Sequence, residues 1–404
     1  MIPNNTLFQP NDPAFLSDPY PVYAQLHQQS PIFYDEASDM WYFASHRDVD
    51  AILRDRRFGR SILHLLSREE LDMPPENPAY EPFEKLGRHS MFDMEPPEHT
   101  RLRSLVHKAF TPRRIQAMQA TIEAIANDLL DQLIPQGEMD VLADFAVPLS
   151  VTVISALLGI PDADRAQLRP WSNAIVKMYE LGHTPQQAEA AIQASQEFAD
   201  YLKDLARQRM ADPQDDLITA LAMIEEEGDR LTEDEMVSTC VLLLNAGHEA
   251  TVNVIGNGLR TLFAHPDAFD QLKGDLALVD TAIEELMRFD TPLQLFKRWV
   301  LHDMEYQGIA LKQGMRVGLL FGAANRDPHV FANPDALDLT RSPNPHISFG
   351  GGVHFCLGAP LARMELRSAY RALLGRCSTM QLQEEPRYHP TYVIRGLESL
   401  SVSI

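Results

Sequence analysis

A glycine-rich stretch of eleven residues holds the side chain best suited to chemistry. It runs from Ser348 to Gly358 and reads S-F-G-G-G-V-H-F-C-L-G, with Cys356 as its only cysteine. Glycines at this density let a backbone approach a flat partner closely and adopt positive φ. A helix start is expected at Pro360, so Cys356 should lie beside N-terminal helix amides, whose partial positive charge favours the thiolate. Such a thiolate is suited to bind a soft or borderline metal such as iron.

Three other interpretations of Cys356 compete with metal binding. A lone cysteine is most often buried and inert. A zinc site would need further ligands, but Cys240 and Cys377 have no CxxC spacing to each other or to Cys356. A nucleophile assisted by His354 stays open, although catalytic pairs normally meet through the fold rather than along the sequence.

The arrangement F-G-x-G-x-H-x-C-x-G is more specific than any of these alternatives. Its fixed positions are Phe349, Gly350, Gly352, His354, Cys356 and Gly358. It resembles the haem-ligand loop of the cytochrome P450 family. The resemblance implies heme b as cofactor, with Cys356 as the proximal iron ligand, Phe349 packed beside the sulfur, and His354 near a haem propionate.

Composition narrows the class of protein. The chain has 404 residues and a formal net charge of −22, which argues against a general nucleic-acid or anionic-membrane surface. Three cysteines without framework spacing indicate a reducing compartment and no structural disulfides. The first residues lack a secretory signal, and no run is expected to approach the roughly 18 apolar residues that span a bilayer. We therefore expect a cytoplasmic protein.

A long central helix should position the next group of residues. Thr232 and Glu235 form a capping box before it, and Pro266 ends it after about 33 residues, or about 50 Å. Its only formal charge between residues 236 and 259 is Glu249. Gly247 lies two residues earlier and costs about 1 kcal/mol relative to alanine within a helix. A charged residue and a glycine, both unfavourable in an apolar helix, together indicate a local kink or groove with a function.

This part of the helix resembles the family's oxygen-binding stretch, (A/G)-G-x-(D/E)-T. Ala246, Gly247 and Glu249 match, whereas Ala250 occupies the place of the hydroxyl residue and Thr251 follows it. One residue turns a helical side chain by about 100°, so Thr251 cannot simply replace the missing group. The resemblance makes Glu249 the proton-transfer residue. A substrate hydroxyl or an ordered water could replace the missing hydroxyl donor. Poor coupling or peroxide-driven turnover is the other possibility.

Two further pairs are ordinary in isolation and gain meaning from the resemblance. His99 and Arg103 lie at i and i+4 of a helix expected from Glu98, and on their own they would form a solvated face. The family pattern makes them propionate contacts, together with Arg298. Glu285 and Arg288, in E-x-x-R, resemble the family's structural ion pair, which we expect Arg341 to complete.

Apolar residues around these positions are expected to line the substrate pocket. They are Leu243, Leu244, Pro292, Leu293, Phe296 and Leu397. Elsewhere, residues 31–44 predict a hairpin, residues 60–92 an irregular segment, and residues 162–181 one of several successive helices. Trp171, Ile175 and Met178 fall on one helical face and are expected to pack in the core.

The resemblance covers the whole chain and implies a mainly α fold with a small β region, the triangular helical prism of the cytochrome P450 family. Residues 1–404 would form a single haem domain. The implied function is a monooxygenase that hydroxylates or epoxidises a small apolar organic substrate with O2. The alternatives are a peroxygenase, an isomerase or dehydratase of oxidised substrates, and a haem-based sensor without turnover.

Electrons should come from a separate ferredoxin and ferredoxin reductase, because no flavin or iron–sulfur sequence is fused to the chain. We expect a monomer that binds neither nucleic acid nor membrane. A basic face for docking the ferredoxin is predicted from seven residues: Arg101, His107, Lys108, Arg113, Arg114, Arg363 and Arg367.

Overall fold

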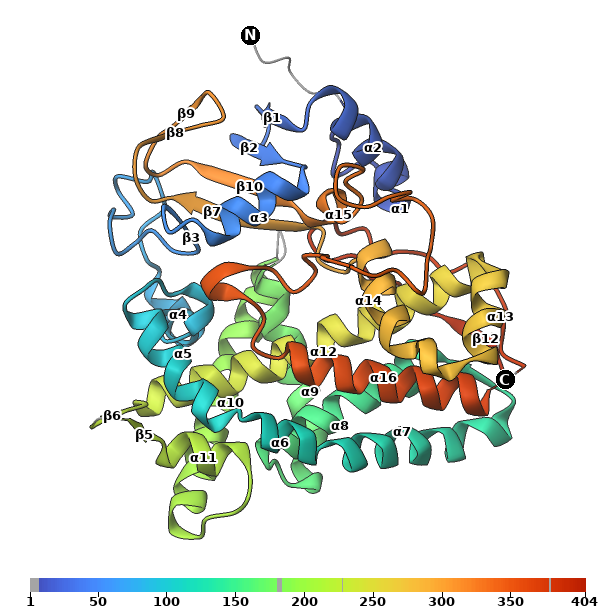
Figure 1. Ribbon diagram of the computed structural model, residues 1–404. Helices are drawn as coiled ribbons and strands as arrows, with labels where there is room; N and C mark the ends of the chain where they lie inside the picture. Colours follow the sequence, from blue (N-terminus) through green and yellow to red (C-terminus); the bar gives the residue numbers. More distant parts are fainter. Residues whose placement is uncertain (1–6, 180–183, 227, 378) are drawn as a thin grey trace. The chain divides into compact units, whose positions relative to one another are not determined.

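The computed structural model describes residues 7–179, 184–226, 228–377 and 379–404 (Figure 1). The chain divides into two compact units. Unit 1 comprises Met1–Ile62, Glu123–Pro148 and Ala250–Ile404, and unit 2 comprises Leu63–Ile122 and Leu149–Glu249. The chain passes between the units four times. Three of these passages lie inside helices, namely α7 (Gln119–Leu133), α8 (Val147–Leu158) and α12 (Glu233–Ala264). The single domain expected from the sequence stays a prediction.

Unit 1 contains a five-stranded sheet in the order β1-β2-β10-β7-β3. The strands are β1 (Ile32–Asp35), β2 (Met40–Phe43), β10 (Arg316–Leu320), β7 (Leu295–Val300) and β3 (Phe58–Gly59). β10 runs parallel to β2, and the other neighbours are antiparallel. The hairpin predicted for residues 31–44 is confirmed as β1 and β2, with Ile32 opposite Phe43.

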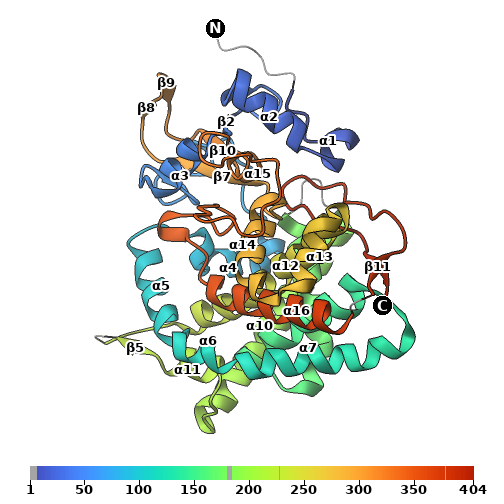
Figure 2. The ribbon, with the colours of Figure 1, turned by 45° about the vertical axis from the view of Figure 1, so that its right-hand side comes forward.

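Alternation along the strands sends side chains to two cores on opposite faces. Phe43 and Leu319 pack in one cluster with residues of α3 (His46–Arg54). Their neighbours Tyr42 and Leu320 pack in the other with residues of α1 (Pro13–Ser17) and α2 (Tyr20–Gln29). The sheet is therefore covered by helices on both faces, as Figures 1 and 2 show.

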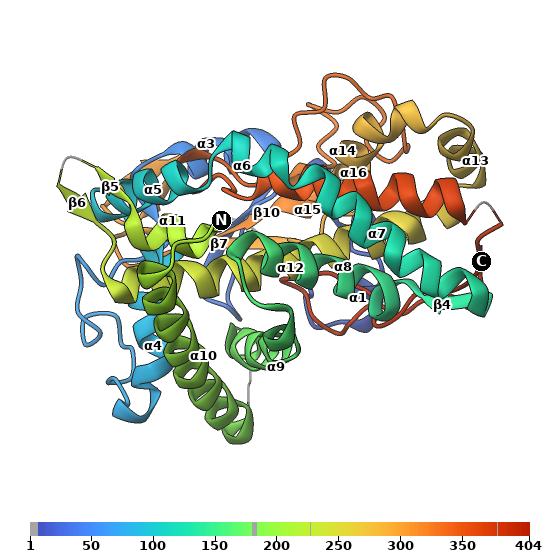
Figure 3. The same cartoon turned by 90° about the horizontal axis from the view of Figure 1, so that it is seen from below.

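The remaining elements of unit 1 surround the last long helix, α16 (Ala359–Arg376). It packs against α14 (Val279–Phe289), and Arg376 Nη1 donates to the carbonyl of Asn127 on α7 (Figure 3). The other elements are α13 (Pro266–Gly274), α15 (Phe321–Ala324), the hairpin of β8 (Met304–Tyr306) and β9 (Ile309–Leu311), and a small sheet of β11 (Gln381–Leu382), β12 (Ser401–Ser403) and β4 (Glu138–Asp140).

Unit 2 is helical and is organised around α10 (Pro185–Ala211), which packs against α9 (Arg165–Val176) and α4 (Glu81–Arg88). Trp171 of α9 stacks on Phe198 of α10, with ring centroids 5.3 Å apart. Of the three residues expected to be core, Ile175 is buried, whereas Trp171 and Met178 are half-buried. The other elements are α5 (Glu98–Ala109), α6 (Pro112–Ala117), α11 (Leu217–Met223), β5 (Glu225–Glu226) and β6 (Asp229–Arg230).

Short turns of helix connect these elements. Those of the 3-10 type are η1 (Pro78–Tyr80), η2 (Met91–Asp93), η3 (Ile134–Gln136), η5 (Asp162–Asp164), η6 (Lys177–Tyr179), η7 (Leu276–Leu278) and η8 (Gly352–His354). The segment η4 (Val141–Ala146) is a π-helix that leads directly into α8.

Helix α12 begins as the sequence predicts. The Thr232 amide donates to Glu235 Oε2 at 2.9 Å, and the Glu235 amide donates to Thr232 Oγ1 at 3.2 Å, which is the reciprocal pair of a capping box. The helix is unbroken over its 32 residues, with no interruption at Gly247.

Several expectations from the sequence were wrong in detail. Residues 60–92 are not irregular throughout, because α4 occupies Glu81–Arg88. The helix expected over residues 162–181 is divided into η5, α9 and η6, and its last two residues lie outside the described part of the chain. One helical stretch, Val141–Leu158, is long and apolar enough to cross a membrane, contrary to expectation, but 67% of it is buried inside the structure.

Candidate active site

The loop around Cys356 has a defined backbone in unit 1. The Cys356 amide donates to the carbonyl of Phe349 at 3.0 Å, and the Gly350 amide donates to that of Ile347 at 2.8 Å. Gly350 and Gly352 have φ of +71° and +65°. A Cβ on Gly352 would lie 2.1 Å from the carbonyl oxygen of Leu53 at the end of α3. Glycine at 352 is therefore required both by conformation and by the close approach of α3.

Cys356 is the one accessible thiol among the three cysteines, all of which are described. Cys356 is exposed, whereas Cys240 and Cys377 are buried. Burial raises the pKa of Cys240 to about 12 and also raises the pKa of Cys377, so neither is suited to act as a thiolate. Cys356 precedes the first residue of α16 by three positions, close to the helix amides.

The donor set around Cys356 fits a metal that brings most of its own ligands. Within the described ranges, no group of three or more His, Cys, Asp or Glu side chains could hold a metal ion. A Cβ on Gly358 would lie 3.9 Å from Cys356 Sγ, so the glycine two residues after the cysteine places no side chain beside the sulfur. A single exposed cysteine in a loop with three further glycines fits a flat metal complex such as haem better than a bare ion.

Arg298 lies on β7 of the same unit. It is 2% exposed, and its guanidinium lies 4.4 Å from the ring centroid of Phe296. A buried cation is favourable only beside a compensating negative or π-rich group. Its ring neighbour is one of the residues predicted for the substrate pocket.

The other predicted pocket residues of unit 1 come together from distant parts of the chain. Leu293 forms a β-bridge with Ile394, and the Arg395 amide donates to the Pro292 carbonyl at 2.7 Å. Leu397 is buried. The segments before β7 and around residue 395 thus lie side by side.

Helices α5 and α12 carry the predicted residues of unit 2. His99 is buried, and Arg103 is half-buried one turn further along α5. On α12, Leu243 and Leu244 are buried, Ala246 is exposed, and Gly247 and Glu249 are half-buried.

Gly247 has a packing reason that its sequence context did not reveal. A Cβ at this position would lie 3.2 Å from Ile154 Cδ1 and Cγ1 on α8. Ser172 Oγ on α9 also donates to Asn245 Oδ1, two residues before, at 2.7 Å. Close contact between helices therefore accounts for this glycine without a break in α12.

The one-residue shift after Glu249 has a clear structural result. Ala250 is exposed, whereas Thr251 is 4% exposed and therefore faces a different side of α12. The hydroxyl of Thr251 therefore cannot reach the position that a hydroxyl at residue 250 would occupy.

Glu285 organises the chain that leads to the cysteine loop. Its carboxylate accepts from Arg288 Nε at 2.7 Å and Nη2 at 2.8 Å, and from Arg341 Nε at 3.0 Å. The Asp338 amide and Asn344 Nδ2 also donate to it, at 2.9 and 3.2 Å. Glu285 and Arg288 are completely buried, which is tolerable only because every charge has partners.

Sequence reasoning missed the preceding acid, Glu284. Arg363 donates to both of its oxygens, at 2.6 and 2.7 Å, and His346 Nε2 donates at 2.9 Å. Burial alone would raise the pKa of Glu284, but the hydrogen bonds from Arg363 and His346 lower the pKa to about 2. The signal in the sequence was the second acid in V-D-T-A-I-E-E-L-M-R, one residue before the E-x-x-R pair.

The predicted basic face is weaker than its sequence indicates. Arg101 pairs with Asp229 and Glu235, and Arg114 with Asp215. Arg363 pairs with Glu284, and Arg367 with Asp280. Four of the seven cations therefore already have carboxylate partners. His107, Lys108 and Arg113 are exposed.

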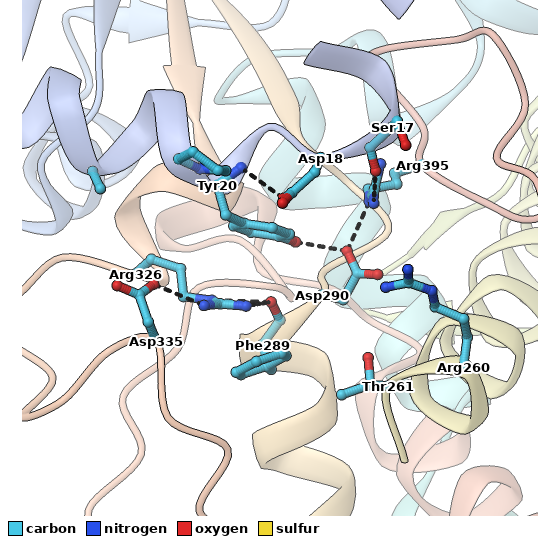
Figure 4. Close-up of a pocket in the computed structure, with 12 residues that line it drawn as sticks. Ser17, Asp18, Tyr20, Arg260, Thr261, Phe289, Asp290, Arg326, Asp335 and Arg395 are labelled. Carbon is cyan, nitrogen blue, oxygen red and sulfur yellow. Dashed lines mark hydrogen bonds and ion pairs between the residues drawn. The ribbon is translucent and has the colours of Figure 1, made fainter. Parts of the chain in front are cut away.

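A cavity of about 380 Å³ in unit 1 is not the apolar pocket expected (Figure 4). Its Arg395 donates to Asp290 at 2.8 Å, and Tyr20 donates to the same carboxylate at 2.6 Å. Arg326 donates to Asp335 at 2.8 Å and to the carbonyl of Phe289. These polar groups thus satisfy one another, and only Pro21, Ala24 and Phe289 add apolar side chains to the lining.

A second cavity, of about 280 Å³, lies among α4, α10 and α12 in unit 2 and is also crossed by charges, with Lys85 Nζ 2.8 Å from Asp234. Neither of these two cavities includes the six residues predicted for the substrate pocket. The assignment of those six residues stays a prediction.

Comparison with known proteins agrees with this geometry. Residues 61–395 match the family model described as Cytochrome P450. The polyketide biosynthesis cytochrome P450 PksS of Bacillus subtilis is 39% identical and is covered over 98% of each chain. The biotin biosynthesis cytochrome P450 of the same organism is 38% identical over 96% of this chain and 97% of its own.

Solved structures extend the likeness to the fold. P450BioI in complex with an acyl carrier protein ligated to hexadec-9Z-enoic acid superposes with a TM-score of 0.89 at 37% identity, covering 97% of this chain and 99% of that one. The mainly helical fold with a small β region is confirmed by this match. The chain belongs to the cytochrome P450 family.

Proposed function

We propose that this cytochrome P450 monooxygenase inserts one oxygen atom of O2 into an apolar organic substrate, with Cys356 as the axial ligand of its haem. The observation that supports it most directly is the accessibility of Cys356, in a glycine loop before α16, beside two buried cysteines. Haem held by a thiolate supplies the chemistry of O–O bond cleavage when bound.

The chain's own residues would hold that group by charge and by close backbone approach. We assign the propionate contacts to His99, Arg103, Arg298 and His354, because carboxylates held away from water need cationic or hydrogen-bonding partners. Gly358 places no side chain beside the sulfur of Cys356, and Gly350 supplies the positive φ of the loop. Phe349, whose carbonyl accepts a hydrogen bond from the Cys356 amide, would pack beside the sulfur.

The ligand assignment is tested with Cys356→Ser. The reduced carbonyl adduct of the native protein should show the thiolate-type absorption band, and the variant should lose it. Cys377→Ser is the matched control, because that cysteine is buried and should leave the band unchanged. An unchanged spectrum in Cys356→Ser would refute the proposal.

We assign proton transfer to Glu249, which is half-buried on α12. Ala250 offers no hydroxyl at the next position, and Thr251 faces away from it. A hydroxyl of the substrate would then supply the missing donor. Ala250→Thr should restore coupling of electron consumption to product on substrate analogues that lack the hydroxyl, and no change would count against this assignment.

Peroxide-driven turnover is the second candidate function, and Ala250 is the observation that favours it. The two are separated by comparing product yields from ferredoxin, reductase and O2 with yields from hydrogen peroxide. A Glu249→Gln variant should lose most of the first yield, because proton delivery limits it, and retain the second, because peroxide carries its own protons.

The proposed pocket consists of the six residues named from the sequence, all apolar: Leu243, Leu244, Pro292, Leu293, Phe296 and Leu397. The names of two relatives refer to polyketide biosynthesis and to a fatty acyl carrier protein. We therefore propose long acyl or polyketide-type substrates as the first to test. Spectral titration with free fatty acids, acyl carrier proteins loaded with the same chains, macrolactones and terpenoids would rank them.

We propose that the protein is a cytoplasmic monomer reduced by a separate acidic ferredoxin. The exposed cations His107, Lys108 and Arg113 on and after α5 would attract it. Reversing the charge of Lys108 and Arg113 should slow reduction at low salt. The matched control reverses Arg207, an exposed arginine of α10, and should have no effect. Reduction that is indifferent to ionic strength would refute the docking surface.

A further inference from the structure

We infer that Arg363, held by Glu284 against the ring of Phe349, is a positioning residue that raises the electron affinity of the metal centre at Cys356. The inference rests on the proposed function, since it requires Cys356 to ligate haem iron. It assigns an inward role to an arginine that the sequence had placed on a docking surface.

The contacts fix the guanidinium of Arg363 in one orientation. Its Nε and Nη2 donate to the two oxygens of Glu284 at 2.6 and 2.7 Å, the parallel geometry in which an arginine fork is most strongly oriented. The centre of the guanidinium then lies 4.5 Å from the centroid of the Phe349 ring. At this distance the cation and the π face attract each other.

The carboxylate of Glu284 is itself held in place. His346 Nε2 lies 2.9 Å from Glu284 Oε2, and the Ser348 amide donates to His346 Nδ1 at 3.3 Å. Because Nδ1 accepts, Nε2 carries the proton and donates to the carboxylate. The imidazole also lies 6.1 Å from the Phe349 ring. A backbone amide, a histidine, a carboxylate and a guanidinium thus lead in sequence to one aromatic ring.

That ring belongs to a residue that is hydrogen-bonded to Cys356, the proposed metal ligand. The carbonyl of Phe349 accepts the amide hydrogen of Cys356, and Arg363 follows Cys356 by seven residues, within the first turns of α16. The pair of Arg363 and Glu284 is neutral overall, but its positive end, the guanidinium, lies against Phe349. A positive end turned toward a thiolate-bound iron favours the reduced state, because that state carries one more negative charge. The Arg363 side chain is 32% exposed, so solvent screens this charge only in part.

Arg367 provides a matched control on the same helix. It lies four residues further along α16, pairs with Asp280 at 3.3 Å and is 39% exposed. It therefore carries the same charge at similar exposure and also has a carboxylate partner, but no ring lies beneath it among the described cation–π contacts. A difference between Arg363 and Arg367 variants isolates the contact with Phe349 from the general effect of removing a cation.

The experiment measures the midpoint potential of purified holoprotein by spectroelectrochemical titration for Arg363→Gln, Arg363→Lys and Arg367→Gln. At a fixed applied potential, Arg363→Gln should lower the ratio of reduced to oxidised protein at least threefold, or about 28 mV at 59 mV per tenfold change for one electron. Arg363→Lys should shift it less in the same direction, because lysine keeps the charge but not the planar fork. Arg367→Gln should leave the ratio within twofold.

The outcomes are distinguishable from failure of the proposed function. If the carbonyl adducts keep the thiolate band and the shifts of Arg363→Gln and Arg367→Gln are equal, the inference is wrong and the ligand assignment stands. If Arg363→Gln gives no soluble holoprotein, Arg363→Lys decides, and a potential equal to that of the native protein refutes the role. In a Phe349→Leu background, Arg363→Gln should lose most of its effect.

Discussion

The contact between α12 and α16 makes one substitution pair unusually informative. A Cβ built on Gly258 of α12 would lie 2.0 Å from the hydroxyl oxygen of Tyr370 on α16 and 3.2 Å from Leu286 Cδ1. Tyr370 is completely buried, and its hydroxyl lies 3.2 Å from the carbonyl oxygens of Val254 and Ile255. The replacement Gly258→Ala must therefore displace this hydroxyl.

The expected loss of stability in Gly258→Ala follows from two destabilising effects and one stabilising effect. Overpacking a buried contact costs about 1–3 kcal/mol, and a displaced buried hydroxyl costs about 1–3 kcal/mol more. Alanine in place of glycine inside a helix returns about 1 kcal/mol. Gly258→Ala should therefore lower the free energy of unfolding by about 1–5 kcal/mol. Tyr370→Phe alone should lower it by about 1 kcal/mol through the lost hydrogen bonds.

The double variant provides the test. Without the tyrosine hydroxyl, the alanine methyl loses its shortest contact, so Gly258→Ala with Tyr370→Phe should be more stable than Gly258→Ala alone, with a coupling energy of about 1–3 kcal/mol. Urea unfolding followed by intrinsic fluorescence measures all three variants. Gly274→Ala is the control, because nothing lies within 4 Å of its added Cβ. Additive effects, or a Gly258→Ala variant as stable as the native protein, would refute the reasoning.

Three further predictions concern the loop and its supports. Gly352→Ala should abolish haem retention, since its Cβ would meet the Leu53 carbonyl, whereas Gly350→Ala, with its nearest contact at 3.9 Å, should only weaken it; haem absorbance per protein distinguishes them. Glu285→Gln should cost about 3–5 kcal/mol in unfolding free energy by leaving its buried arginine partner without a counter-charge. The pKa of Glu284 falls from 4.5 to about 2 on folding, so its stabilisation is complete above pH 4.5 and is lost as the pH falls toward 2. After allowance for solvent screening this amounts to about 1–2 kcal/mol, and Glu284→Gln should flatten the dependence of the urea midpoint on pH in that window.

The sequence predicted best what depends on neighbours along the chain. The start of α12 followed from Thr232 and Glu235 alone, and α5 begins at Glu98 as expected. The β1–β2 hairpin followed from alternation about a polar turn. In each case the residues that determine the element lie within a few positions of it.

Features that depend on distant partners could not be predicted in the same way. Gly247 was attributed to a functional kink or groove, but α12 has no break there, and the packing of Ile154, about ninety residues earlier, accounts for the glycine. Arg363 was assigned to a surface, because Glu284 and Phe349 approach it only in the folded chain. No run as long and apolar as Val141–Leu158 was expected, because Asp144 and Pro148 interrupt its apolar residues in the sequence.

The 27 residues from Asn325 to Gly351 contain no helix and no strand, yet they lead directly to the cysteine loop. Side chains fix their course: Ser348 Oγ donates to the Met287 carbonyl, and the Ile347 amide to Asn325 Oδ1. A substitution here can destroy the cofactor site without removing a single helical residue. Far-ultraviolet circular dichroism, which reports secondary structure, would not distinguish such variants from the native protein. Visible absorption, which reports bound haem, would detect them.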